Sequence, residues 1–398
     1  MGELRRVLGV RGATVVGLGA MLGTGVFAAW TPATAYAGSA LMLALVIAAA
    51  IAALNAVATG SLARALPESG GAYAYGRAYL HRGAGIIAGY SFVIGKVASA
   101  GAAALTIGAY AWPGQERLVG LVAVALALAL DLRGIVKSVR VTAVLVAFVL
   151  GVLGIFAASC VSSFVAREPA TPVSIEGPAS PLAVLAAAGI LFVAFAGYAR
   201  VTVLGEEVRD PARTIPRAMI ASFAVVIVVY TVIAVVVLIA LVAGAELTSA
   251  PLEGIAQAFG SASVAVIVRI GAVVAAGGVL LSLIAGVGRT LFAMGRGGDA
   301  PRALASVSAR TGVPARAELL AGALAAAVVL IGGIGFALAL SAATILAYYA
   351  VAHLAVIARA TRGAPRAPWA LGLTSAFGLI GCLAVIAALL LVLWPRVG

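Results

Sequence analysis

Hydrophobic residues gather into eleven long runs that are separated by short polar segments. A helix needs about 20 apolar residues to cross the roughly 30 Å hydrocarbon core of a bilayer, and most of these runs reach or approach that length. The pattern therefore predicts an all-α polytopic membrane protein with about eleven transmembrane helices. The predicted spans are residues 13–36, 40–63, 85–111, 117–132, 139–161, 181–204, 217–243, 264–293, 318–338, 340–358 and 369–394.

Composition agrees with this pattern. Hydrophobic residues make up 64% of the chain and charged residues only 10%, which is far from the usage of soluble proteins. The first run is too long and too rich in glycine for a cleaved signal peptide, so we expect it to stay as the first span. The two cysteines, Cys160 and Cys382, lie alone on apolar spans, where we expect them to pack between helices and to form neither a disulfide nor a metal site.

The net charge of +13 raises the question of a nucleic-acid partner, but its distribution favours a membrane. With the N-terminus in the cytoplasm, the inner segments hold 20 Lys and Arg against 8 Asp and Glu, and the outer segments hold 3 against 5. This is the positive-inside pattern, so we expect contact with anionic lipid and no nucleic-acid partner. An odd number of spans then places the C-terminus outside, and the Ala- and Arg-rich composition is typical of a bacterial protein of the cytoplasmic membrane.

Two of the spans are interrupted by glycines, at residues 17–27 in span 1 and 195–200 in span 6. Spans that lie five apart run in opposite directions, as an inverted repeat requires. We therefore expect a first five-helix repeat at 1–161, an external linker rich in Pro, Ser and Thr at 162–180, a second five-helix repeat at 181–360 and one additional C-terminal helix at 361–398.

A helix that breaks inside a membrane leaves backbone groups unpaired, which is tolerated where they line a cavity or bind a ligand. The outer half of span 1 would direct free N–H groups at a carboxylate, and the outer half of span 6 would direct free carbonyls at an ammonium group. The breaks therefore predict a site for an amino acid, with the aromatic residues as gates or pocket walls. Its residues would be Gly23, Thr24, Gly25, Val26, Phe27, Phe195, Ala196, Gly197 and Tyr198. The alternative is close helix packing, which is natural in a chain with 48 glycines.

Four segments occur in a characteristic order: Gly23-Thr24-Gly25-Val26-Phe27, the run LPESGGAY at 66–73, the run EEVRDPARTIPRA at 206–218, and the run RTLFAMGR at 289–296. With these segments the chain resembles the amino acid/polyamine/organocation (APC) transporter superfamily over spans 1 to 10. The resemblance implies a broken-helix fold of two inverted five-helix repeats and transport of amino acids or related amines.

The sequence departs from that superfamily at two points. Many members have a twelfth span and this sequence has eleven, so both a monomer and a dimer stay open. Proton-coupled relatives often carry a lysine in span 5, whereas the closest counterpart here is Val149.

Two basic residues lie inside spans near the predicted site. Lys96 is about ten residues into span 3, close to the bilayer centre, and we hypothesise that it supplies the titrating or charge-balancing group that is missing at Val149. The alternative is a lysine that only binds carbonyls and holds helices together. Arg200 follows the second break by three residues and should lean toward the cavity, unless it pairs with an acid or a helix end. Two positive charges would favour a neutral or acidic substrate over a cationic one.

Three further residues are candidates for coupling or gating. Ser282 in span 8 lies near the place where sodium-coupled relatives coordinate an ion, although a serine in a helix often bonds to its own backbone. Glu206 and Glu207, at the cytoplasmic end of span 6, would form ion pairs of an inner gate or else remain as solvated loop charge. Thr214 is expected to cap span 7 ahead of Pro216.

The combined prediction is a secondary active transporter that carries neutral or acidic amino acids by alternating access. Its coupling ion is expected to be a proton, with sodium less favoured. An enzyme is not expected, because the sequence lacks an associated nucleophile, base and acid, and no metal ligands cluster. The alternatives are a membrane sensor that binds an amino acid without transporting it, and an exchanger of polyamines or other organic amines.

Overall fold

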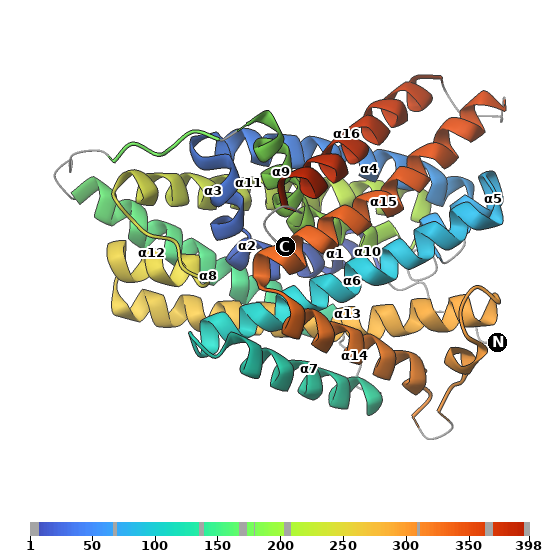
Figure 1. Ribbon diagram of the computed structural model, residues 1–398, viewed down its shortest axis with the longest axis horizontal. Coiled ribbons are helices and arrows are strands. Elements are labelled where there is room, and N and C mark those ends of the chain that lie inside the picture. The colour runs from blue at the N-terminus through green and yellow to red at the C-terminus, as the bar shows by residue number, and fades with distance from the viewer. Residues whose placement is uncertain are drawn as a thin grey trace.

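The computed structural model describes residues 8–66, 70–134, 139–166, 173–178, 180–202, 208–308, 311–362 and 369–393. Apart from an isolated backbone bridge between Leu8 and Val208, the regular secondary structure of these residues is helical. Nine helical stretches of described residues are long and apolar enough to cross a membrane. The predicted all-α membrane fold is therefore confirmed (Figure 1).

Sixteen α-helices follow one another in the described residues. They are α1 (Val10–Met21), α2 (Thr24–Ala28), α3 (Trp30–Ala37), α4 (Leu41–Ala65), α5 (Ala72–Tyr79), α6 (Arg82–Ala111), α7 (Glu116–Leu132), α8 (Val139–Ala166), α9 (Pro181–Phe195), α10 (Ala199–Thr202), α11 (Pro211–Val242), α12 (Pro251–Phe259), α13 (Ala262–Arg296), α14 (Ala315–Ile331), α15 (Ile334–Thr361) and α16 (Trp369–Leu393). Three short 3₁₀ turns join them: η1 (Gly38–Ala40), η2 (Ala196–Tyr198) and η3 (Arg302–Ala305).

Each predicted span overlaps one of these helices or a broken set of them. The helices α7 and α14 have only 17 residues each and are not among the nine stretches that are long enough to cross a membrane. The number eleven and the internal repeat therefore stay predictions, as do the boundaries of the repeats at 161, 181 and 360.

Some boundaries were wrong, and glycine and proline explain why. The predicted spans 318–338 and 340–358 meet in the structure at Gly332 and Gly333, which lie outside both α14 and α15. Glycine ends a helix readily because it loses little by leaving it. The cap predicted at Thr214 is also wrong, because α11 begins at Pro211. Its N-cap is Asp210, whose φ of 46° is not helical, and Pro216 lies inside the helix. The short helices α5 and α12 were not predicted at all.

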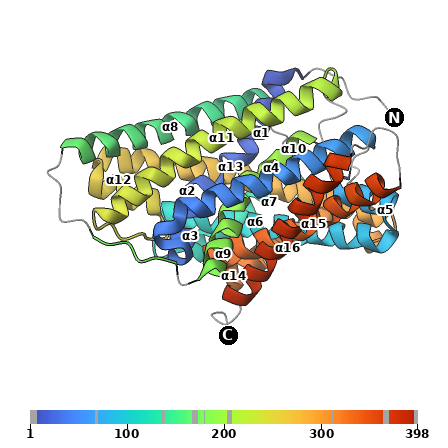
Figure 2. The same cartoon turned by 90° about the horizontal axis from the view of Figure 1, so that it is seen from above.

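The long helices form two groups that run side by side (Figures 1 and 2). In one group, which we call the broken-helix group, α1 packs on α10 and α11, and α4 packs on α9, α10 and α11. In the other, which we call the scaffold group, α6, α7, α13 and α14 all pack on one another. Helix α8 contacts α1 and α13, and α15 lies along both α6 and α16. Each group combines predicted spans that are five apart, which is the arrangement that an inverted repeat predicts.

The molecule is elongated along its helices and has two distinct ends. The short helix α5 and the turn η3 lie at one end, on the right of Figure 1, which we call the α5 end. Helices α3 and α12 lie at the opposite end, which we call the α12 end (Figures 1 and 2).

Candidate functional site

The first predicted break is present. Helix α1 ends at Met21 and α2 starts at Thr24, with Leu22 and Gly23 between them in non-helical conformations. The Leu22 N–H still donates to the Leu18 carbonyl at 2.7 Å, but no side chain caps the start of α2. A Cβ at Gly23 would collide with Val279 of α13, so glycine permits the close approach of the break to the scaffold group.

The second interruption takes the form of a tightened turn. Helix α9 ends at Phe195 and passes through the 3₁₀ turn η2 into the short α10. The Ala196 N–H is shared between the carbonyls of Phe192 and Val193. A 3₁₀ turn within a longer helix often marks a hinge.

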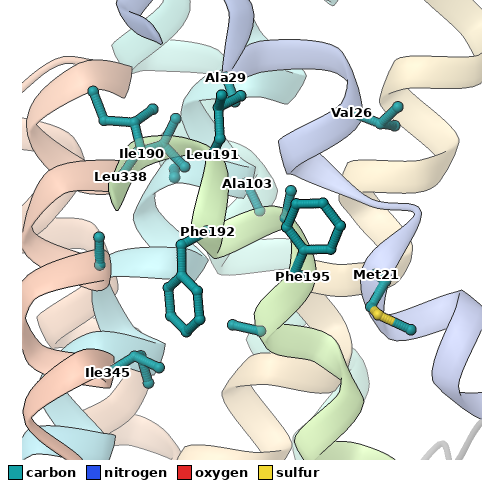
Figure 3. Close-up of a cluster of buried hydrophobic side chains, with 14 of the residues drawn as sticks. Met21, Val26, Ala29, Ala103, Ile190, Leu191, Phe192, Phe195, Leu338 and Ile345 are labelled. Atoms are coloured by element: carbon teal, nitrogen blue, oxygen red, sulfur yellow. The ribbon is translucent and has the colours of Figure 1, made fainter. Parts of the chain in front are cut away.

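The two interruptions lie directly against each other. A Cβ at Gly197 would meet the carbonyl carbon of Ala20 at 2.5 Å, and one at Gly25 would meet the Cβ of Ala194 at 2.7 Å. Close packing, the alternative explanation for these glycines, is therefore one of their roles. Figure 3 shows Phe195 on the side of α9 that faces the chain between Met21 and Val26.

One polar side chain at the first break has no internal partner. Thr24 is 7% exposed, and its Oγ1 forms no hydrogen bond within the described residues. Most buried hydroxyls are hydrogen-bonded, and an exception of this kind is typical of a position that a ligand or water completes.

Aromatic side chains surround the breaks and are fully buried. The ring of Phe27 lies edge-on to Tyr110 with 6.0 Å between centroids, and the Tyr110 hydroxyl donates to the Phe27 carbonyl at 2.8 Å. Phe195 packs on Tyr230 of α11 at 5.4 Å. Tyr198 stacks on Tyr349 of α15 at 5.6 Å. The aromatic residues among the predicted substrate residues are thus buried in the protein interior, against rings from α6, α11 and α15.

Of the three residues predicted to carry charge or coupling, Lys96 packs on Phe92, and Arg200 and Ser282 line a cavity. Lys96 lies on α6 with its Nζ 5.7 Å from the centre of the Phe92 ring, and the charge of Arg200 acts on it. Arg200 on α10 and Ser282 on α13 line one cavity of about 90 Å³ at the α5 side of the breaks. The Ser282 hydroxyl donates to the Gly278 carbonyl of its own helix at 3.1 Å, as its alternative explanation expected. Glu206 and Glu207, the predicted gate, lie outside the described residues.

Three charged residues of this cavity were missed by the sequence analysis: Asp131, Arg289 and Glu318. The signal was available, since Asp131 closes one apolar span, Glu318 begins another, and Arg289 lies inside a third. Charged residues at the ends of spans have a routine explanation in the membrane interface, and only the packing of α7, α13 and α14 shows that these side chains converge.

At the α12 end, Arg269 of α13 binds both a carboxylate and the end of α6. Its guanidinium lies 3.4 Å from the Glu253 carboxylate and donates to the carbonyls of Tyr110 at 3.0 Å and Ala111 at 3.1 Å. Burial raises the pKa of Glu253, and the Arg269 charge partly offsets that rise. A second cavity of about 340 Å³ lies nearby, lined among others by Glu116, Arg117 and the turn at Gly332–Gly335.

At the α5 end, Asp299 joins α5 and α6 to the end of α13. Its carboxylate accepts hydrogen bonds from Tyr73 at 2.7 Å and from Arg82 at 2.8 Å, and it forms a further ion pair with Arg77. Burial alone would raise the pKa of Asp299, but these hydrogen bonds and the two positive charges outweigh it and hold the pKa below the usual range. This cluster also brings two of the characteristic segments together, since Tyr73 ends one and Asp299 follows the other.

Comparisons with known proteins show the family and the fold of this chain. A family model described as amino acid permease matches residues 8–397. An uncharacterized transporter of Mycobacterium tuberculosis is 44% identical over 97% of this chain and 87% of its own length. The branched-chain amino acid permease of Bacillus subtilis is 27% identical over 78% of this chain and 72% of its own length.

A solved structure gives the same fold. It is that of a Na⁺-coupled sialic acid symporter in a substrate-bound, outward-open state, which superimposes with a TM-score of 0.56 over 96% of this chain and 88% of its own, at 14% identity. The predicted membership of a transporter family, in place of an enzyme family, is confirmed. The chain belongs to the amino acid permease family.

Proposed function

We propose that this permease is a secondary active transporter that binds a neutral or acidic amino acid at the two helix breaks and carries it by alternating access. The observation that carries the proposal is the buried, unpaired Thr24 hydroxyl at the start of α2. It lies beside the uncapped N–H groups of that helix, so hydroxyl and backbone together offer hydrogen bonds to a carboxylate.

The two groups of helices support a mechanism of alternating access. The breaks belong to the broken-helix group, while Val279 and the charged cavity residues Asp131, Arg289 and Glu318 belong to the scaffold group. Tilting one group against the other would expose the site first to one end and then to the other. The aromatic rings that enclose the breaks would act as the gates.

The charges support the choice of substrate. Lys96 and Arg200 lie close enough for their positive charges to interact, and Arg200 follows directly after the second break. A cationic side chain would add a third positive charge in a region of low dielectric constant. The relatives are named for different substrates. A methylthioribose transporter of Bacillus subtilis is 27% identical, and a vacuolar cationic amino acid transporter of Arabidopsis thaliana is 26% identical.

Orientation and coupling complete the proposal. Because the basic residues concentrate at the α5 end, we place that end in the cytoplasm of a bacterial cell, and the C-terminus outside. The coupling ion is a proton, and Lys96 is the charge near the bilayer centre that responds to it.

The test is counterflow exchange in sealed liposomes that contain the purified protein. Labelled leucine, glutamate and lysine represent neutral, acidic and cationic substrates. We expect exchange of leucine or glutamate in preference to lysine. Preferential exchange of lysine would contradict the substrate class, and binding without exchange would favour the sensor.

Thr24→Val tests the site itself. The variant keeps the shape of the side chain and loses the hydroxyl, so we expect substrate affinity to fall about tenfold while folding is retained. Thr106→Val is the matched control, because the Thr106 hydroxyl is buried and already donates to the Ala102 carbonyl at 2.8 Å. Equal affinities in the two variants would place the substrate elsewhere.

A further inference from the structure

Charged side chains from four separate helices meet in the 90 Å³ cavity at the α5 end. They are Asp131 of α7, Arg200 of α10, Arg289 of α13 and Glu318 of α14. A cavity of this size and polarity holds several water molecules, and such water can deliver protons to a carboxylate and remove them.

Glu318 is one of two buried carboxylates in this cavity. It is 2% exposed, and its Oε2 has no hydrogen-bond partner among the described residues. The bare backbone at Gly288 presses against its stem, since a Cβ there would lie 2.6 Å from the Glu318 Cγ. The carboxyl group is therefore held in place with one oxygen unsatisfied.

Two influences on Glu318 oppose each other. Burial without a donor to Oε2 favours the neutral acid, whereas the positive charge of Arg289 favours the carboxylate. Arg289 belongs to the scaffold group, as Glu318 does, so its contribution is fixed. Arg200 lines the same cavity from α10, in the broken-helix group, so the distance of this second positive charge from Glu318 changes whenever that group moves.

We propose that Glu318 is a proton-binding site that couples the position of α10 to the proton gradient. When α10 carries Arg200 away, Oε2 takes a proton from the cavity water and forms an O–H bond. When Arg200 returns, that bond breaks and the proton goes back to water on the cytoplasmic side. Arg200 also acts on Lys96, so a single movement changes the electrostatic environment of both groups.

The other charged groups around Glu318 are accounted for. Asp131 lines the same cavity from α7, and Arg133 lies just beyond the end of that helix. Arg302 of η3 and Arg316 of α14 itself are exposed to solvent. Helix α6 meets α14 through Gly101 and Val328 and brings no charge to this contact.

The alternative role for Glu318 is structural, since an acidic residue in the first turn of a helix stabilises its N-terminus. That role predicts a loss of stability in a neutral variant with an unaltered response to pH. A proton-binding role predicts that the neutral variant keeps its stability and loses its response to pH. The pH response is therefore the decisive measurement.

Because this assignment rests on the proposed transport of an amino acid, the experiment separates the two. Counterflow at equal pH on both sides tests transport alone, and net uptake under a gradient of one pH unit tests coupling. In the wild-type protein the gradient should raise accumulation, up to about tenfold for one proton per substrate. In Glu318→Gln, counterflow should stay within about threefold of wild type and the response to the pH gradient should disappear.

Glu253→Gln is the matched control, since Glu253 is also buried with an unpaired Oε2 but lies at the α12 end, and it should keep the wild-type response. A Glu318→Gln protein that exchanges substrate and still responds fully to the gradient would overturn the assignment, as would wild-type uptake driven by sodium alone. Absence of wild-type counterflow would instead overturn the proposed transport, and the assignment with it.

If Glu318→Gln abolishes counterflow, substrate binding decides the question. The shift in thermal unfolding temperature on adding leucine or glutamate is measured in detergent at pH 5.5 and pH 8. We expect the shift to depend on pH in the wild-type protein and to be independent of pH in the variant. The same pH dependence in both would overturn the assignment.

Discussion

Each end of α13 places an arginine beside a buried glutamate of another helix, and the surroundings of the two arginine–glutamate pairs differ. Arg269 near the α12 end and Arg289 near the α5 end are about 30 Å apart along the helix. The charge of Arg269 acts on Glu253 of α12, and that of Arg289 acts on Glu318 of α14. Arg269 forms an ion pair with Glu253 and also binds two carbonyls at the C-terminus of α6. Arg289 instead shares a cavity with Glu318, Asp131 and Arg200.

The difference lies in which helices contribute the charges. At the α12 end, both partners come from α12 and α13, which are consecutive helices in contact, and the arginine satisfies backbone groups that would otherwise be orphaned. At the α5 end, one charge comes from α10, which follows the second break. The Arg269–Glu253 pair therefore stays together when the two groups of helices move. The balance of charges at the α5 end, in contrast, depends on the relative position of the two groups.

The largest expected effect concerns Asp299. We expect its ion pairs, and not the charged cavity, to stabilise the α5 end. Asp299→Asn removes the charge that Tyr73, Arg77 and Arg82 share, and we expect it to lower the free energy of unfolding at pH 7 by about 2–3 kcal/mol. The measurement is thermal unfolding of the purified protein in detergent.

The pH dependence of that effect has a definite sign. Since the folded protein holds the pKa of Asp299 below its usual range, its stabilisation is present above the ordinary aspartate pKa of about 3.9 and is lost as the pH falls through the folded value. The gap between wild type and Asp299→Asn should therefore shrink in acid. A gap that stays constant from pH 7 to pH 3 would show that the charge of Asp299 does not stabilise this end.

A smaller effect should distinguish the two arginines directly. Arg269→Gln breaks an ion pair and two hydrogen bonds to carbonyls, so we expect a loss of about 2 kcal/mol in unfolding free energy, reduced from a fully buried case because the side chain is 39% exposed. Arg289→Gln should cost less than about 1 kcal/mol, because water in the cavity can replace its contacts. Thermal unfolding measures both, and equal losses would remove the distinction between the two ends.

The smallest effect concerns Glu253. The fold raises the pKa of this group, so the stabilisation linked to its protonated form is present at low pH and is lost as the pH rises through the folded value. Glu253→Gln should therefore raise the unfolding temperature slightly, by about 1–2 °C, and by more at pH 8 than at pH 5. A lower unfolding temperature at pH 8 would show that the ion pair with Arg269 outweighs the cost of burying the charge.

Hydrophobic runs were sufficient to predict the long helices, because a segment that crosses a membrane must satisfy its own backbone hydrogen bonds. The breaks were also predictable, since Gly23 and Gly197 interrupt such runs at related positions. The structure adds that Gly23 accommodates Val279 and Gly197 accommodates Ala20. These residues are more than 170 positions apart in the sequence, so no local pattern contains either contact.

The charged cavity could not be predicted in the same way. Asp131, Arg289 and Glu318 come from three helices whose relative rotation is set by packing, and each taken alone looks like an ordinary residue at or within a span. Arg200 and Lys96 were found because a charge in the middle of an apolar run is costly and therefore conspicuous. The sequence thus predicted the charges near the breaks and missed the carboxylates that face one of them.

The backbone bridge between Leu8 and Val208 joins the chain just before α1 to the chain just before α11, with the Arg209 N–H donating to the Leu8 carbonyl at 2.8 Å. Main-chain ties of this kind do not depend on side-chain identity, so they persist through substitution at either residue. The bridge thereby links the start of α1, the first half of an interrupted span, to the start of the long helix α11, so a tilt of one helix would be transmitted to the other through the main chain.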